Sequence, residues 1–171
     1  MDAKVKQKFP TKLFEVPEMG NEPLPVEPFV SPEWFEKEKE KIFKQAWLEV
    51  GRVDHIPNVG DYFLAEIEMF GWSVIVMRGK DNQVRAFHNA CTHRGMKVAK
   101  EPRGNKKGFR CEFHGWTFST EGELVHMNGE EYFPNAKPCD LNLRPVTMDT
   151  WNGFVFLNSH MSRQGLMRFD I

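Results

Sequence analysis

Two short segments of this sequence each place one Cys and one His close together. Cys91 and His93 stand two residues apart in Cys-Thr-His-Arg-Gly, and Cys111 and His114 stand three apart in Cys-Glu-Phe-His-Gly-Trp. Residues two apart in an extended segment point the same way, and a step of three suits a turn. Each segment can therefore direct one thiolate and one imidazole toward a common point, and seventeen residues separate His93 from Cys111.

Two Cys and two His form a ligand set with a specific redox use. They can hold a [2Fe–2S] cluster unevenly, with two thiolates on one iron and two imidazoles on the other. Zinc accepts the same four ligands, and spacing alone does not exclude it. A zinc finger, however, keeps its two Cys together and its two His together, whereas each segment here carries one of each. The pattern favours the iron–sulfur centre and leaves a structural zinc site as the alternative.

The paired pattern, Cys-x-His followed by Cys-x-x-His, resembles the Rieske motif. This resemblance implies that Cys91 and Cys111 bind one iron, while His93 and His114 bind the other. Respiratory Rieske proteins carry an extra Cys in each cluster loop and a Ser after His-Gly, and other residues take those places here. We therefore expect no disulfide and a potential near the low end of the range for Rieske centres, roughly −150 to +300 mV. The residues expected to surround the cluster are Arg94, Gly95, Met96, Phe113, Gly115 and Trp116.

Segments outside the motif sharpen the resemblance. Residues 34–52, 57–63, 87–91 and 151–158 are similar to the large (α) subunit of aromatic-ring-hydroxylating oxygenases. That family implies a relay of single electrons from a ferredoxin or reductase to a mononuclear iron centre, and assembly into trimers. Its mononuclear iron is held by two His and one carboxylate in a catalytic domain. No matching His-rich segment occurs in this sequence, so we assign no catalytic residue and expect the chain alone to transfer electrons. A stand-alone Rieske ferredoxin is the alternative, although such small ferredoxins have no counterpart of the helix expected at 31–47.

Composition limits the kinds of partner and the cell compartment that we expect for this chain. The chain has 171 residues, a net charge of −1 and three Cys. A charge this close to zero gives no strong field for binding nucleic acid or a membrane surface. No segment reads as a signal peptide or a membrane-spanning helix. If iron takes two of the Cys, Cys139 is left alone, which argues against a disulfide framework and fits a reducing cytoplasm.

The elements that must position the ligands read as short strands. Ser31-Pro32-Glu33 has the features of a helix start, and apolar residues at helical spacing predict a helix over 31–47. We expect an extended or disordered arm over 1–29, a mainly antiparallel β domain of Rieske type over 30–158, and a tail over 159–171. The ligand loops should occupy adjacent hairpin tips of a smaller cluster-binding subdomain at about 88–118. Strands are predicted at 48–53, 62–67, 72–78, 84–88, 108–111, 116–118, 123–125, 146–151 and 154–157.

The segment between the two ligand pairs is basic. It carries seven cationic residues and a single acid, Glu101. A positive collar beside an exposed redox centre can steer an acidic electron donor such as a ferredoxin, although a solvated loop that only keeps the protein soluble explains the same charges. The cationic residues of this collar are Arg94, Lys97, Lys100, Arg103, Lys106, Lys107 and Arg110.

Overall fold

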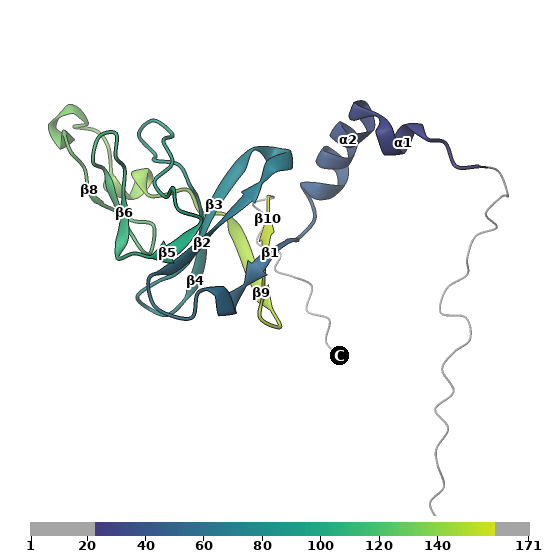
Figure 1. Cartoon of the computed structure of the whole chain (residues 1–171). Helices are drawn as coiled ribbons and strands as arrows, with labels where there is room; N and C mark the ends of the chain where they lie inside the picture. The colour runs from purple at the N-terminus through teal and green to yellow at the C-terminus, as the bar shows by residue number, and fades with distance from the viewer. Residues whose placement is uncertain (1–22, 160–171) are drawn as a thin grey trace, which may run out of the picture.

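The computed structural model describes residues 23–159. Within this range three antiparallel sheets form the body of the protein, and a helical segment projects from one side (Figure 1). The predicted mainly antiparallel β fold is therefore confirmed. Most of the expected N-terminal arm and all but the first residue of the expected tail lie outside the described residues. No helix in the described part of the chain is long and apolar enough to cross a membrane.

The helical segment begins where the sequence predicts. Helix α2 (Pro32–Glu38) is capped by Ser31, whose hydroxyl oxygen accepts a hydrogen bond from the backbone N–H of Trp34 at 3.3 Å. It continues as a π-helical turn, η1 (Lys39–Phe43), and ends there rather than near Trp47 as expected, because β1 starts at Leu48. A four-residue helix, α1 (Glu27–Val30), precedes it within the expected arm. Pro at the start of α1 is compatible with a helix, since that position needs no backbone N–H.

Two of the sheets form the centre and one side of the body. The four-stranded sheet has the order β4-β3-β2-β5, and a three-stranded sheet has the order β1-β10-β9. Strands β2 and β3 pair from Tyr62↔Met77 to Ile67↔Trp72, and β3 has four consecutive buried residues, Val74 to Met77. The bounds are β1 Leu48–Arg52, β2 Asp61–Ile67, β3 Trp72–Arg78, β4 Val84–His88, β5 Arg103–Asn105, β9 Thr147–Trp151 and β10 Phe154–Asn158.

The third sheet carries one of the two ligand segments. Strands β6 (Gly108–Arg110), β7 (Thr117–Ser119) and β8 (Leu124–His126) are consecutive in the chain and adjacent in space. This sheet lies on the opposite side of β2–β5 from β1, β9 and β10 (Figure 1). Because β8 belongs to it, the unit that carries this ligand segment reaches past residue 118. Short 3-10 turns complete the fold: η2 Val53–His55, η3 Glu68–Phe70, η4 Glu130–Tyr132 and η5 Pro138–Leu141.

Only one ligand segment sits at a hairpin tip. Residues 111–116 connect β6 to β7, which pair directly, as expected. Residues 91–96 instead follow β4 and lead to β5, and these two strands lie at opposite edges of the four-stranded sheet. Strand β5 was not predicted, because its Arg-Gly-Asn sequence is fully exposed and has no apolar alternation. It exists through backbone pairing with the start of β2.

The β2–β3 pair separates two hydrophobic cores. Val74 and Val76 face one core, shared with β10, while Ile75 and Met77 face the other. Alternate residues of a strand point to opposite faces, so strands buried on both faces become continuously apolar. The second core also contains Cys91 and Cys111. Both predicted thiolate ligands are thus set against the packed interior.

Candidate metal centre

The two ligand segments fold into loops of the same backbone shape. The first ligand loop is residues 91–96 and the second ligand loop is residues 111–116. In each, the Gly N–H donates to the carbonyl of the Cys four residues earlier, at 2.7 Å for Gly95 and 2.9 Å for Gly115. Each Cys N–H donates to the carbonyl of the sixth residue, at 2.8 Å in the first loop and 2.7 Å in the second. The two glycines have φ of 74° and 77°, the left-handed conformation that Gly adopts readily.

These loops bring the predicted ligands together in two pairs, His93 with His114 and Cys91 with Cys111. The imidazole rings of His93 and His114 lie with centroids 4.6 Å apart and planes at 62°. The thiols of Cys91 and Cys111 are 3% and 2% exposed, and the Cys111 thiol is near enough to raise the pKa of Cys91. Each ligand loop thus contributes one imidazole to a pair of neighbouring rings and one buried thiol to a pair of neighbouring thiols.

Burial and backbone donors act on Cys91 in opposite directions. Burial is the largest influence and raises the pKa of this thiol, while hydrogen bonds from the backbone N–H groups of His93 and Arg94 lower it. The net shift is upward, so the free thiol stays protonated at neutral pH. Metal binding must therefore release that proton, because the thiolate is the form that binds iron.

Aromatic rings enclose His93. The indole of Trp116 is stacked on the imidazole of His93, with centroids 4.8 Å apart and planes at 14°. Phe133 meets the same imidazole edge-on at 5.7 Å and the indole at 5.5 Å. Desolvation by burial is the largest reason that the pKa of His93 is lowered, so the neutral imidazole, the form that binds metals, is favoured.

One buried atom tests whether the residues fit an iron–sulfur cluster. Among the described residues, Nδ1 of His93 is one of three buried side-chain nitrogen or oxygen atoms that have no hydrogen-bond partner, and Nε1 of Trp116 is another. A buried polar nitrogen without a partner is costly, and a metal bond to its lone pair would satisfy it. No three His, Cys, Asp or Glu residues within 23–159 converge on one metal position. A [2Fe–2S] cluster needs only two side chains at each iron, so the set fits.

The residues expected around the cluster differ in their exposure to solvent. Trp116 is 1% exposed and Gly115 is buried, whereas Arg94 and Gly95 are exposed. Met96 and Phe113 are 40% and 54% exposed, and the ring centroid of Phe113 lies 3.9 Å from that of His114. Trp116 and Phe133, which contact the imidazole of His93, therefore cover it on the side that faces the interior.

Sequence reasoning missed several residues that hold the loops. Asn128 Nδ2 donates to the backbone carbonyl of His114 at 3.0 Å, and its Oδ1 contacts His126 Nε2 at 2.7 Å. Thr92 Oγ1 donates to the carbonyl of Leu141 at 2.6 Å, and Phe133 joins the aromatic enclosure. Apart from the Asn128–His126 contact, these contacts join residues at least 14 apart in the sequence, and no local pattern marks them. Cys139 is exposed in η5, outside both ligand loops.

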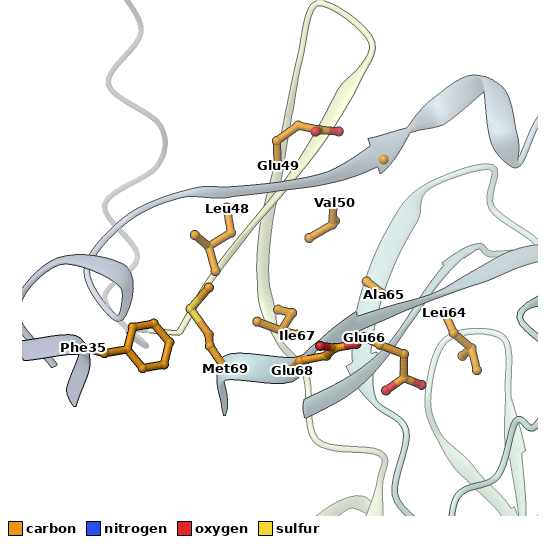
Figure 2. Close-up of a pocket in the computed structure, with 11 residues that line it drawn as sticks. Phe35, Leu48, Glu49, Val50, Leu64, Ala65, Glu66, Ile67, Glu68 and Met69 are labelled. Atoms are coloured by element: carbon orange, nitrogen blue, oxygen red, sulfur yellow. The ribbon is translucent and has the colours of Figure 1, made fainter. Parts of the chain in front are cut away.

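A groove lies away from the ligand loops and is lined by other residues. It has a volume of about 950 Å³ and is bordered by β1, the end of β2, η3 and Phe35 of α2. Figure 2 shows Phe35 directed toward Leu48 and Met69 at one end of this groove. None of the four predicted ligands lines it, so it is separate from the candidate metal centre.

Comparison with known proteins identifies the family of this chain. The Rieske [2Fe–2S] domain family matches residues 46–137. The chain is 42% identical to 2-aminobenzenesulfonate 2,3-dioxygenase subunit alpha of Alcaligenes sp, over 80% of this chain and 35% of that protein. It is 37% identical to biphenyl 2,3-dioxygenase subunit alpha of Rhodococcus jostii, over 72% and 27%.

A solved structure shares the fold as well as the sequence. The naphthalene 1,2-dioxygenase of Rhodococcus sp. superposes with a TM-score of 0.75 at 34% identity, over 80% of this chain and 31% of that one. The chain thus spans about a third of the length of the relatives that it matches. It belongs to the Rieske [2Fe–2S] domain family, in the form found in the N-terminal part of ring-hydroxylating oxygenase α subunits.

Proposed function

We propose that this chain relays single electrons through a [2Fe–2S] cluster held by Cys91 and Cys111 on one iron and by His93 and His114 on the other. One observation carries the proposal: two loops of equal backbone shape place two imidazoles side by side, with a buried ring nitrogen that has no protein partner. When bound, such a cluster accepts and releases one electron.

The residues of the chain tune and protect that centre. Backbone N–H groups of the first ligand loop face the Cys91 sulfur, and such donors raise the potential of a cluster. Trp116 and Phe133 exclude water from one side of His93. Phe113 and Met96 are exposed residues of the two loops, so this edge is where a partner can approach closely.

An acidic ferredoxin or reductase is the proposed electron donor. Within the basic collar, Lys97 pairs with Glu66 at 3.1 Å, and Lys100 pairs with Glu112. Among residues 23–159, no salt bridge engages the four other exposed cationic residues of the collar, which are Arg94, Arg103, Lys107 and Arg110. Part of the positive charge is therefore available to attract an acidic partner.

The proposed acceptor is a mononuclear iron in the catalytic domain of an aromatic-ring-hydroxylating oxygenase. Support comes from relatives named as biphenyl and benzene dioxygenase α subunits, although a carnitine monooxygenase oxygenase subunit of Escherichia coli is also 36% identical. One quaternary ammonium Rieske monooxygenase structure is described in terms of inter-subunit electron transfer. By this analogy we propose transfer within a trimer, in the cytoplasm.

Metal analysis and spectroscopy test the cluster. We expect the purified protein to be red-brown, with two irons and two acid-labile sulfides per chain, and to give a Rieske-type electron paramagnetic resonance spectrum when reduced. Cys91→Ser and Cys111→Ser should lose the cluster. Cys139→Ser is the matched control and should retain it, because Cys139 is exposed and lies outside both ligand loops. A colourless protein with one bound zinc would instead establish the zinc-binding alternative.

A second experiment separates the relay from a stand-alone ferredoxin. The chemically reduced chain, mixed with biphenyl and oxygen, should form no hydroxylated product on its own. The same chain should pass its electron to an oxygenase catalytic domain supplied separately, if the two associate. Rapid, equally fast electron delivery to unrelated oxygenases would favour the stand-alone carrier.

A further inference from the structure

A buried carboxamide closes the first ligand loop. Asn89 is 3% exposed and stands two residues before Cys91. Its Oδ1 accepts from the backbone N–H groups of Val98 at 3.0 Å and Ala99 at 2.9 Å, and its Nδ2 donates to the carbonyl of Ala99 at 2.7 Å. Nδ2 also donates to Ser73 Oγ at 3.1 Å. All four hydrogen-bonding positions of the carboxamide are therefore used.

The position of these bonds gives them a specific mechanical effect. Asn89 precedes the first ligand loop and its backbone partners, Val98 and Ala99, follow it. One side chain thus ties together the two ends of the segment that carries Cys91 and His93. Val98 and Ala99 are 6% and 0% exposed, so both anchor points are fixed in the core.

The second ligand loop is closed in another way. Arg110 and Thr117 flank that loop and are paired residues of the β6–β7 ladder, so the hairpin itself holds the loop ends. The first ligand loop joins β4 to β5, which are not neighbours, and no hairpin closes it. Two loops of the same shape are therefore closed in different ways. The hydrogen bonds of Asn89 hold the ends of the first loop, where no strand pairing does so.

The support extends into the central sheet. Ser73 Oγ, which accepts from Asn89, donates to Glu66 Oε1 at 2.7 Å, and Glu66 and Ser73 are directly paired residues of β2 and β3. Lys97, just after the first ligand loop, donates to the same carboxylate oxygen at 3.1 Å. The path from Asn89 through Ser73 and Glu66 to Lys97 starts before the loop and ends after it. A closed network of this kind can restrict the loop more than its separate bonds would.

We propose that Asn89 is a positioning residue for the cluster: its bonds to Val98, Ala99 and Ser73 fix the first ligand loop and so set the redox potential. This inference rests on the proposed function. The loop backbone points its N–H groups at the Cys91 sulfur. A loop that is free to relax weakens those N–H to sulfur bonds, and fewer donors to sulfur make a cluster more reducing.

The test compares midpoint potentials of the cluster-loaded proteins by voltammetry. Asn89→Ala should shift the potential to a more negative value and lose the cluster several-fold faster during incubation with a chelator. Ser73→Ala removes only the outer partner and should give a smaller shift of the same sign. Val155→Ala is the control, because Val155 is fully buried in the other core. That variant should be less stable to urea but keep the wild-type potential.

Two results would overturn the inference. If Asn89→Ala is less stable but its cluster has the wild-type potential, Asn89 serves folding alone. If Asn89→Ala does not fold, Ser73→Ala decides, and an unchanged potential in that variant counts against the network. Either result leaves the proposed electron relay intact. A wild-type protein without iron and sulfide would refute the relay itself.

Discussion

Gly95 and Gly115 occupy equivalent positions in the two ligand loops but have different surroundings. Both are left-handed, with φ of 74° and 77°, and both donate to the Cys carbonyl four residues earlier. A Cβ on Gly95 would meet no atom within 4 Å, whereas a Cβ on Gly115 would lie 2.5 Å from Asn128 Nδ2 and 3.0 Å from Arg110 Nη2. The same backbone shape is therefore exposed in one loop and packed in the other.

This difference predicts unequal effects of the same substitution. Gly95→Ala should cost about 1–2 kcal/mol of the free energy of unfolding, because a side chain is strained at positive φ. Gly115→Ala should cost about 1 kcal/mol more, since Asn128 must move and give up its hydrogen bond to the His114 carbonyl. Urea denaturation of the two variants measures the difference. Equal losses would mean that Asn128 adapts freely and does not hold the second ligand loop.

Replacing an imidazole ligand with a thiolate should retain the cluster and lower its potential. His93→Cys and His114→Cys each add negative charge, so we expect a fall on the order of 100 mV, toward the roughly −400 mV of all-Cys plant-type ferredoxins. Voltammetry of the loaded proteins provides the measurement. His55→Cys is the control, since His55 is exposed in η2 and lies outside both ligand loops. A wild-type potential in both ligand variants would refute the ligand assignment.

Electron uptake from an acidic donor should depend on salt. If the basic collar steers the donor, the second-order rate of reduction by an acidic ferredoxin should fall roughly tenfold from low to high ionic strength. Stopped-flow reduction of the cluster measures this rate. Arg94→Gln and Arg110→Gln should lower the rate at low salt. Lys80→Gln removes an exposed charge from the turn between β3 and β4 and should not. A reduction rate that does not change with ionic strength would mean that the basic collar serves only to keep the protein soluble.

Stability in acid should depend on one ion pair at the β3–β4 turn. Arg85 donates to both carboxylate oxygens of Asp81, and this hydrogen bonding is the main cause that lowers the pKa of Asp81 from 3.8 to about 2. A pKa depressed by folding stabilises the protein above the unfolded pKa, and that contribution disappears as the pH falls from about 4 toward 2.

Denaturation with urea at a series of pH values reveals the contribution of Asp81. The wild-type protein should be more stable than Asp81→Asn at pH 6, and the gap should narrow between pH 4 and pH 2.5. Both proteins lose any acid-labile cluster in that range, so the difference reports the carboxylate. Glu101→Gln makes the same charge change at an exposed site and should run parallel to the wild type. A gap that stays constant with pH would show that the Asp81 carboxylate contributes nothing.

The strands and ligand loops could be predicted because their signals are local. Strand β3 matches its predicted range, and the start of α2 follows from the Ser31 cap. Strand β5 could not be found, because partner strand β2, rather than any apolar pattern of its own, stabilises it. The sequence also did not predict the roles of Asn89, Asn128 and Phe133, for a related reason. Their roles depend on which distant backbone or ring they meet, and only the folded chain decides that.

The two ligand loops extend from different sheets, and this has a mechanical consequence. The first follows β4 of the four-stranded sheet, and the second is the tip of the β6–β7 hairpin. Any group bound by all four side chains would therefore act as a cross-link between these layers, as a disulfide does in a secreted domain. Oxidative damage to that group would do more than stop electron flow. It would also remove this cross-link, so that the shared hydrophobic core alone would hold the small sheet against the large one.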